Sequence, residues 1–380
     1  MRELPPGVDR SPSAPSSSPL PEACSSASMV PLFVVGCDRS GTTLLTSLIE
    51  SGLGLAAPLE THFIPYFART LFLWGNLKRP QARERLLMAI LAFMEMLVAR
   101  TYPGKGPEVV HPVTLLAVRE EARTLAAGAE GFGGLIRGLF ARYATLRGQR
   151  GWVDNSSFYE SLSLELWQRH LPDLKVIHIV RDGRDVALSW LNAWWGPATL
   201  GEAAWLWSRH VRDKRAWGAI HPEAYLEIRY ETLLTQPEET LKTITTFLGW
   251  PFEPGRTIDL SASPAARVLS TGGTHDLLSG PVRAENREKW RRAMTPEDQR
   301  FFEFVAGETL KSSGYPSEQQ AFGLGESLRL WFRLLFSLLR RFVTPIYYAK
   351  KAKTWLPLVL KLVGPAGMER VVRRVCGPGR

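Results

Sequence analysis

Short apolar runs alternate with segments of helical periodicity along most of the chain. Residues 32–35 form the first run, and leucine and isoleucine then recur at helical spacing up to residue 49. Three further runs, each followed by a helical segment, stand at 151–154, 175–180 and 224–229. This alternation predicts an α/β fold with a mainly parallel sheet flanked by helices. In such sheets, ligands bind beyond the carboxyl ends of the strands.

A long helical segment separates the first two predicted strands. Residues 51–65 show no period and are predicted to form a loop. Residues 66–150 are largely helical by pattern, with amphipathic helices at 83–100 and 136–146. We interpret this segment as a helical insertion that covers the site.

The two ends of the chain differ from this body in composition. Residues 1–29 are rich in Pro and Ser and poor in large apolar groups, which predicts a disordered leader without a signal peptide or anchor. Residues 325–380 form a basic amphipathic tail. Its arginines and one serine fall on a single helical stripe, and leucine and aromatic residues fill the rest. The members of the stripe are Arg329, Arg333, Ser337, Arg340 and Arg341.

The charge of the chain is concentrated in this tail. The whole protein carries a formal net charge of +10. Residues 325–380 hold twelve Lys and Arg against two Asp and Glu, so the remaining residues balance to zero. This distribution argues against an extended nucleic-acid groove across the protein. The tail suits the surface of an anionic membrane, and packing on the body or on a second subunit of a homodimer is the alternative.

Cysteine usage points to a reducing compartment. The three cysteines, Cys24, Cys37 and Cys376, are too few and too scattered for a disulfide framework or a zinc site. We therefore expect a cytoplasmic protein without a metal. The alternative left open is a cytoplasmic protein that also associates peripherally with a membrane through its tail.

The turn after the first strand carries the most specific signal. Gly36, Gly41 and Thr43 keep the spacing of a phosphate-binding Walker A loop, but Thr42 replaces its lysine and a positive charge stands earlier, at Arg39. A strand, a glycine turn and a helix direct backbone N–H groups at an anion. The sequence thus predicts a P-loop-type fold, similar to nucleotide kinases, whose loop holds an anion other than an ordinary triphosphate.

Residues 39–45 resemble the 5′-phosphosulfate loop of sulfotransferases that use 3′-phosphoadenosine 5′-phosphosulfate (PAPS), in particular the tyrosylprotein sulfotransferases and related prokaryotic enzymes. The resemblance covers roughly residues 31–315, so that residues 30–316 are the expected sulfotransferase domain. It implies that the sulfate end of PAPS is bound by the loop, and that Arg39 also acts in catalysis. The loop residues are Arg39, Ser40, Gly41, Thr42, Thr43 and Leu44.

Two further positions follow from the same resemblance. Glu60, in a Glu-Thr-x-x-Ile-Pro segment, matches the catalytic base that removes the proton of the acceptor hydroxyl. Arg181 ends the strand at 175–180, and Ser189 follows eight residues later; this pair matches the 3′-phosphate site. An arginine fork suits a phosphate.

Later segments of the chain agree with this interpretation. Tyr230 matches a tyrosine that lies along the nucleotide, and Lys289 with Trp290 matches a C-terminal Lys-Trp segment that reaches the cofactor phosphates. Asn155 stands where relatives often have a lysine, and His275 stands in a loop where relatives can place a catalytic serine.

The function expected from the resemblance is transfer of a sulfuryl group from PAPS to a hydroxyl acceptor. The acceptor is a glycan, a lipid-linked molecule or a small alcohol, and the product nucleotide is 3′-phosphoadenosine 5′-phosphate (PAP). Two alternatives stay open from the sequence. One is an ATP-dependent phosphotransferase with a degenerate loop, and the other is a non-catalytic adaptor associated with membranes.

Overall fold

The computed structural model describes residues 29–58, 61–101, 118–155, 163–193, 195–253, 287–317 and 322–343, together with 361, 362 and 367.

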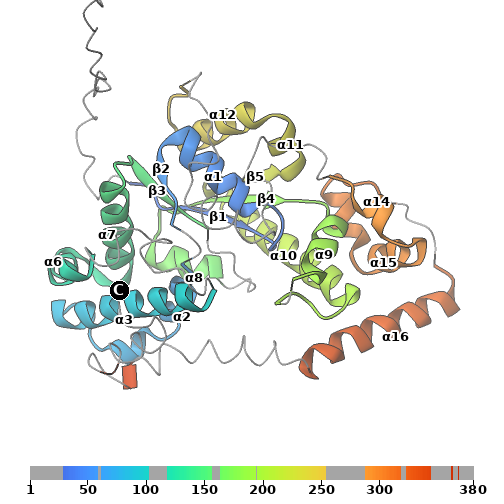
Figure 1. Ribbon diagram of the computed structural model, residues 1–380, viewed down its shortest axis with the longest axis horizontal. Coiled ribbons are helices and arrows are strands. Elements are labelled where there is room, and N and C mark those ends of the chain that lie inside the picture. The colour runs from blue at the N-terminus through green and yellow to red at the C-terminus, as the bar shows by residue number, and fades with distance from the viewer. Residues whose placement is uncertain are drawn as a thin grey trace, which may run out of the picture.

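Five parallel strands form one sheet at the centre of the molecule (Figure 1). From one edge to the other the strands are β2 (Leu55–Ala56), β3 (Gly151–Asp154), β1 (Leu32–Gly36), β4 (Lys175–Val180) and β5 (Tyr225–Arg229). The predicted α/β fold with a parallel sheet is therefore confirmed. Strand β1 lies in the middle, with β3 on one side and β4 on the other.

Strands β1 and β4 are apolar because both faces of the sheet are covered. All five residues of β1 are buried, as are five of the six residues of β4. Such continuous apolar runs are typical of parallel sheets with helices on both faces. The register pairs Val35 with His178 and Gly36 with Ile179, so the two strands end side by side.

Helices surround the sheet in the order expected from the alternation of patterns (Figure 1). Those next to the strand ends are α1, α9, α11 and α14, and others, including α2, α3, α7, α8 and α12, cover the faces of the sheet. Their bounds are α1 (Thr42–Leu53), α2 (Phe63–Ala68), η2 (Leu71–Trp74), α3 (Pro80–Thr101), α6 (Ala122–Gly128), α7 (Gly131–Leu146), α8 (Ser163–His170), α9 (Gly183–Leu191), α10 (Leu200–Ile220), η3 (Pro222–Ala224), α11 (Tyr230–Thr235), α12 (Pro237–Leu248), α14 (Trp290–Ala293), α15 (Pro296–Ser312), α16 (Leu324–Arg340) and η8 (Arg341–Val343).

The two faces of the sheet belong to two different apolar clusters. Successive side chains of a strand point to opposite faces. Leu32 and Val34 of β1 therefore pack with α1, α11 and α12. Phe33 and Val35 pack on the other face with α2, α3, α7 and α8. Helix α1 is thus held directly beneath the turn that follows β1.

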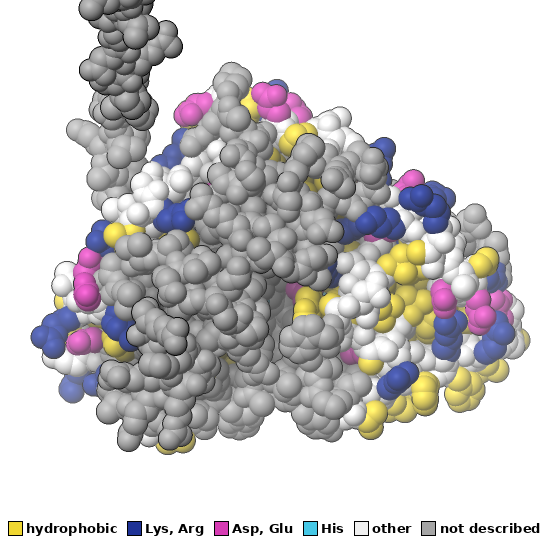
Figure 2. Space-filling model, viewed as in Figure 1, with side chains coloured by type: hydrophobic (Ala, Val, Ile, Leu, Met, Phe, Trp, Pro, Cys, Tyr) yellow, Lys and Arg dark blue, Asp and Glu magenta, His cyan; other side chains and the backbone are white. Residues whose placement is uncertain are grey.

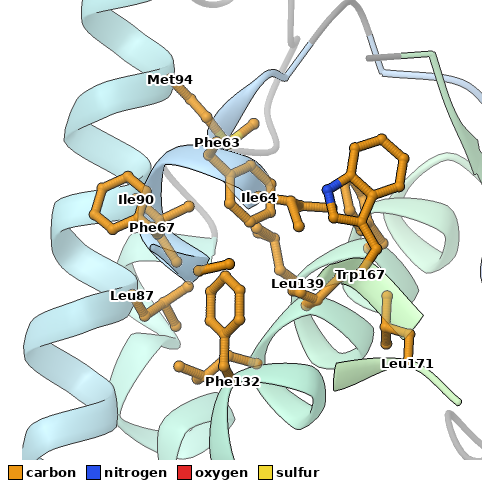
Figure 3. Packing of buried hydrophobic residues seen from close by; sticks show 14 of the residues in the cluster. Phe63, Ile64, Phe67, Leu87, Ile90, Met94, Phe132, Leu139, Trp167 and Leu171 are labelled. Carbon is orange, nitrogen blue, oxygen red and sulfur yellow. The ribbon is translucent and has the colours of Figure 1, made fainter. Parts of the chain in front are cut away.

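The helices between β2 and β3 pack as part of the main core. Figure 3 shows Phe63, Ile64 and Phe67 of α2 surrounded by side chains of α3, α7 and α8. The labelled neighbours are Leu87, Ile90, Met94, Phe132, Leu139, Trp167 and Leu171. Because α2 begins at Phe63, this packing fixes the chain shortly after residue 60.

The predicted loop at 51–65 is wrong in detail. Helix α1 continues to Leu53, β2 occupies Leu55–Ala56, and α2 begins at Phe63. A strand of two residues is too short to show a period, and Pro65 is tolerated because it lies in the first turn of α2.

Several other expectations fall on residues outside the described ranges. They concern the leader, Glu60, His275, and most of the tail after residue 343. Within the part that the structure describes, no helix has both the length and the apolar character needed to cross a membrane.

Candidate functional site

The turns after β1 and β4 lie next to each other because these strands are neighbours in register. Residues 37–41 connect β1 to α1, and residues 181 and 182 connect β4 to α9. The end of β3, on the other side of β1, and the end of β5, beside β4, complete this edge of the sheet. The edge is where parallel α/β sheets bind their ligands.

The first turn has a left-handed backbone at two positions. Arg39 has φ 70° and Gly41 has φ 94°, and the Ser40 N–H donates to the Cys37 carbonyl at 3.0 Å. Alternation of left- and right-handed residues makes a concave nest of backbone N–H groups. Gly41 is the N-cap of α1 and offers no side chain to the first turn of the helix, which contains no acidic residue. The backbone N–H groups at the N-terminus of α1 are therefore open to a ligand in this turn, and the positive end of the helix dipole lies there as well.

Side chains of the two turns are joined by hydrogen bonds. Arg39 Nε donates to Ser189 Oγ of α9 at 2.9 Å, and Arg181 Nη1 donates to the Arg39 carbonyl at 3.1 Å. These contacts connect residues 150 and 142 positions apart in the sequence. The two guanidinium groups predicted to hold anions thus belong to one network at one edge of the sheet.

Tyr230, at the start of α11, closes the gap between the turns. The Arg181 guanidinium lies over its ring, 4.4 Å from the centroid. A Cβ at Gly41 would lie 2.5 Å from Cδ2 of the same ring, so only glycine allows this approach. Burial raises the pKa of Tyr230, and the charge of Arg181 lowers it.

Two buried hydroxyls at this edge have no hydrogen-bond partner among the described residues. They are Ser40 Oγ in the first turn and Tyr230 Oη. Buried polar atoms are normally paired. Unpaired donors beside two arginines are what a site for an anionic, hydroxyl-rich ligand requires.

Acidic residues behind the arginines fix the second turn. Asp185 accepts from the Trp290 N–H at 2.9 Å and lies 3.9 Å from Arg181. Arg184 forms a bidentate pair with Asp182, and its guanidinium lies 3.5 Å from the centroid of the Trp290 ring. Burial raises the pKa of Asp185, although Arg181 and the Trp290 N–H lower it. Trp290 therefore supports the turn through Arg184 and Asp185, while Lys289 beside it is exposed.

Two residues that the sequence analysis did not identify connect β4 to the end of β5. Glu231 accepts from the Tyr315 hydroxyl at 2.9 Å and from the Asp182 N–H at 3.4 Å. The Tyr315 hydroxyl also contacts the Val180 carbonyl at 3.2 Å. Burial raises the pKa of Glu231, whereas hydrogen bonds, including that from Tyr315, lower it. Glu231 directly follows Tyr230 in the sequence, but no sequence signal marks Tyr315.

The end of β3 anchors the residue that follows Glu60. Thr61 is buried and its hydroxyl donates to Asp154 Oδ1 at 3.1 Å. Asn155, next along the chain, is also buried. Asp154, the last residue of β3, pairs with Phe33 of β1, three residues before β1 ends. Thr61 therefore lies at the carboxyl end of β3 and next to β1.

A sequence model described as the sulfotransferase family matches residues 31–254, more than half of the chain. The chain belongs to the sulfotransferase family. The predicted family is thereby confirmed, and both turns of the site lie within the matched residues.

One individual relative of this chain is distant in sequence. A protein of Aquifex aeolicus, described only as uncharacterized, is 26% identical over 270 residues. The match covers 69% of this chain but 30% of that protein, so the chain spans less than a third of its length.

A solved sulfotransferase domain shares the fold of this chain. The domain from the Synechococcus PCC 7002 olefin synthase is 18% identical with a TM-score of 0.50, covering 80% of this chain and all of that domain. The domain from the curacin biosynthetic pathway is 21% identical with a TM-score of 0.48, covering 76% and 99%.

The remaining residues of the first turn and the start of α1 divide between the candidate site and the core. Thr42 and Thr43 open α1, and Leu44 packs into the cluster beneath it, so that Leu44 can offer only its backbone N–H to a ligand. No group of three or more His, Cys, Asp or Glu suited to a metal occurs in the described ranges.

Alanine at Gly41 tests the contact between the first turn and Tyr230. Gly41→Ala should lower the free energy of unfolding by about 1–2 kcal/mol for the left-handed backbone and by about 1–3 kcal/mol more for overlap with the ring. Urea denaturation measures the loss. Gly148→Ala is the matched control, because Gly148 has φ 63° and no atom within 4 Å of an added Cβ. Equal losses in the two variants would mean that the Tyr230 ring moves aside freely.

Proposed function

We propose that this sulfotransferase moves a sulfuryl group from PAPS to a hydroxyl acceptor. The observation that supports this proposal most strongly is the network of Arg39, Ser189 and Arg181. It holds two cationic side chains from neighbouring turns at one edge of the sheet. PAPS carries anionic groups at both its 5′ and 3′ positions, so two cationic turns side by side match its charge.

The residues present fit such a donor in a definite arrangement. The Arg39 guanidinium and the N–H groups of residues 40–44 would hold the 5′-phosphosulfate. Arg181 and Ser189 would hold the 3′-phosphate, with Tyr230 along the nucleotide. Ser189 already accepts a hydrogen bond from Arg39, so its hydroxyl connects the two anion sites. Lys289, which is exposed at the start of α14, is the cation proposed to approach from the opposite side.

In the proposed reaction, PAPS supplies the sulfuryl group and a phosphate leaving group. The acceptor oxygen forms a bond to sulfur as the bond between sulfur and the phosphate oxygen breaks. Arg39 and the loop N–H groups stabilise the negative charge on the departing oxygen. Glu60 accepts the proton of the acceptor hydroxyl.

Support for Glu60 comes from its neighbour in the chain. Thr61 is fixed to Asp154 at the carboxyl end of β3, next to β1. Helix α2, which begins two residues later, is held in the core by Phe63 and Phe67. The backbone that follows Glu60 is thus held at the carboxyl end of β3, beside the strand that carries the Arg39 turn, which supports the role proposed for Glu60.

The proposed acceptor classes are a glycan, a lipid-linked molecule and a small alcohol. Incubation of a native extract with radioactive PAPS, followed by mass spectrometry of labelled molecules, would identify the class. An ATP-dependent phosphotransferase would instead label these molecules from ATP, and an adaptor would label none from either.

Loss of the Arg181 side chain should weaken PAP binding more than it lowers the maximal rate. Arg181→Ala removes a charged hydrogen-bond donor worth about 1.5–3 kcal/mol, which corresponds to a loss of affinity of roughly 10- to 150-fold. Isothermal titration with PAP measures the effect. Arg209→Ala, which removes a surface arginine paired with Asp213 on α10, is the charge-matched control. An unchanged affinity in Arg181→Ala would remove this residue from the phosphate site.

Substitution of Glu60 should separate binding from chemistry. Glu60→Gln keeps the size of the side chain but cannot accept the proton, so it should retain PAP affinity and lose about 100-fold or more in transfer rate. The measurement is the initial rate with saturating labelled acceptor, alongside a PAP titration. Full turnover in this variant would show that Glu60 is not the base.

A further inference from the structure

Helix α16 exposes a continuous apolar face. Of the twelve large hydrophobic residues that are strongly exposed in the described part of the chain, nine lie in residues 324–343. Hydrophobic side chains gather at the lower right of Figure 2, where Figure 1 places α16. The exposed ones in residues 324–343 are Leu324, Leu328, Trp331, Phe332, Leu335, Phe336, Leu339, Phe342 and Val343, each between 47% and 88% exposed.

This apolar face is large for a solvent-exposed surface. Its four aromatic side chains, at about six-tenths exposure, present on the order of 400 Å² of apolar area before the leucines are counted. The largest apolar patch on a typical monomer is about 300–600 Å² in total, and such patches are often functional.

The opposite side of α16 is held firmly against the body. Leu330 and Leu334 are buried in a cluster with Phe301 of α15. Ser337 is also buried, where an added Cβ at Gly201 of α10 would lie 2.9 Å from its Cβ. The small residues at 201 and 337 therefore allow a close approach of two helices.

Ion pairs on this inner side fix the rotation of the helix. Arg300 of α15 forms a bidentate pair with Glu326 at 2.8 and 2.9 Å. Arg333 pairs with Asp298 at 2.6 Å and lies over the Phe301 ring at 4.1 Å. Turning the apolar face inward would break both pairs, so the exposed face is a stable property of the fold.

The predicted stripe of arginines is divided by this packing. Arg333 and Ser337 face the body, whereas Arg329 and Arg340 are exposed along one flank of the apolar face. Glu326 is the one acidic residue between 324 and 343, and it is paired with Arg300. The outward side of α16 therefore combines apolar side chains with cations.

The chain that follows continues this charge. Residues 344–380 contain eight Lys and Arg and one Glu. We propose that the outer face of α16 docks on an anionic lipid bilayer, with the helix lying in the plane of the interface. A helix of 17 residues spans about 25 Å, and an apolar face of this kind sinks about 5–10 Å into the boundary between headgroups and acyl chains. Arg329 and Arg340 then lie at the level of the anionic headgroups.

A second copy of the chain fits this face less well than a bilayer does. In a two-fold symmetric contact the same patch meets itself. The exposed cations Arg329 and Arg340 would then meet the same cations, and the face offers no free carboxylate to pair with them. An anionic bilayer complements both the apolar residues and the charge.

Vesicle binding by the full chain tests the proposal. Wild-type protein should sediment with vesicles of phosphatidylcholine containing about 30% phosphatidylserine, and binding should fall as salt rises. The double variant Phe332→Ser with Phe336→Ser should bind roughly tenfold or more weakly, because it removes two aromatic anchors. Phe72→Ser is the matched control, since Phe72 is 80% exposed but lies in η2, away from this face. Replacing Arg329 and Arg340 with Gln should weaken binding to the anionic vesicles and leave binding to pure phosphatidylcholine unchanged.

Three results would overturn the proposal. The first is no binding of the wild type, and the second is binding by the double variant equal to that of the wild type, which would place the contact elsewhere in the chain. The third is a combination of results: the wild type is a dimer, the double variant is a monomer, and neither binds vesicles. That combination would make this face a subunit interface. The variants should fold normally, because the substituted side chains are exposed. A midpoint of thermal unfolding equal to that of the wild type would verify this.

Discussion

The hydrogen bond from Arg181 to the Arg39 carbonyl, together with that from Arg39 to Ser189, is the constraint on which the site depends. Two guanidinium groups brought together repel one another, and nearby carboxylates offset part of this repulsion. Asp185 lies near Arg181, and Asp182 and Glu303 pair with the adjacent Arg184. Arg184 is thereby neutralised by its own carboxylates, and Asp185 offsets part of the charge of Arg181.

This arrangement follows from the pairing of β1 with β4 in a parallel register. Gly36 and Ile179 are opposite each other, so the turns that follow begin at the same height of the sheet. Tyr230 then packs on Gly41 and under Arg181, and joins β5 to the same edge. Each element contributes one part of the site, and the sheet order brings the parts together. The sulfotransferase family and the shared fold are consistent with this geometry.

Much of this was predictable because the chemistry lies close to strand ends in the sequence. Apolar runs predicted four of the five strands, and the glycine spacing predicted the turn between β1 and α1. The two-residue β2 was missed because it is too short to show a pattern. Tyr315 was missed because it reaches Val180 and Glu231 from the end of α15, and no local signal reports such a contact. The rotation of α16 could not be predicted either, since it depends on Arg300 and Asp298 of a different helix.

The account stands on the claim that the Arg39 and Arg181 turns hold opposite ends of one nucleotide. Isothermal titration of the wild-type protein with PAP, AMP and ATP measures this most directly, because AMP lacks the 3′-phosphate and ATP carries its extra charge at the 5′ end. The account predicts that PAP binds roughly 10- to 150-fold more tightly than AMP, as expected for one charged hydrogen-bonding group, and more tightly than ATP. Equal affinity for PAP and AMP, or tighter binding of ATP, would contradict it.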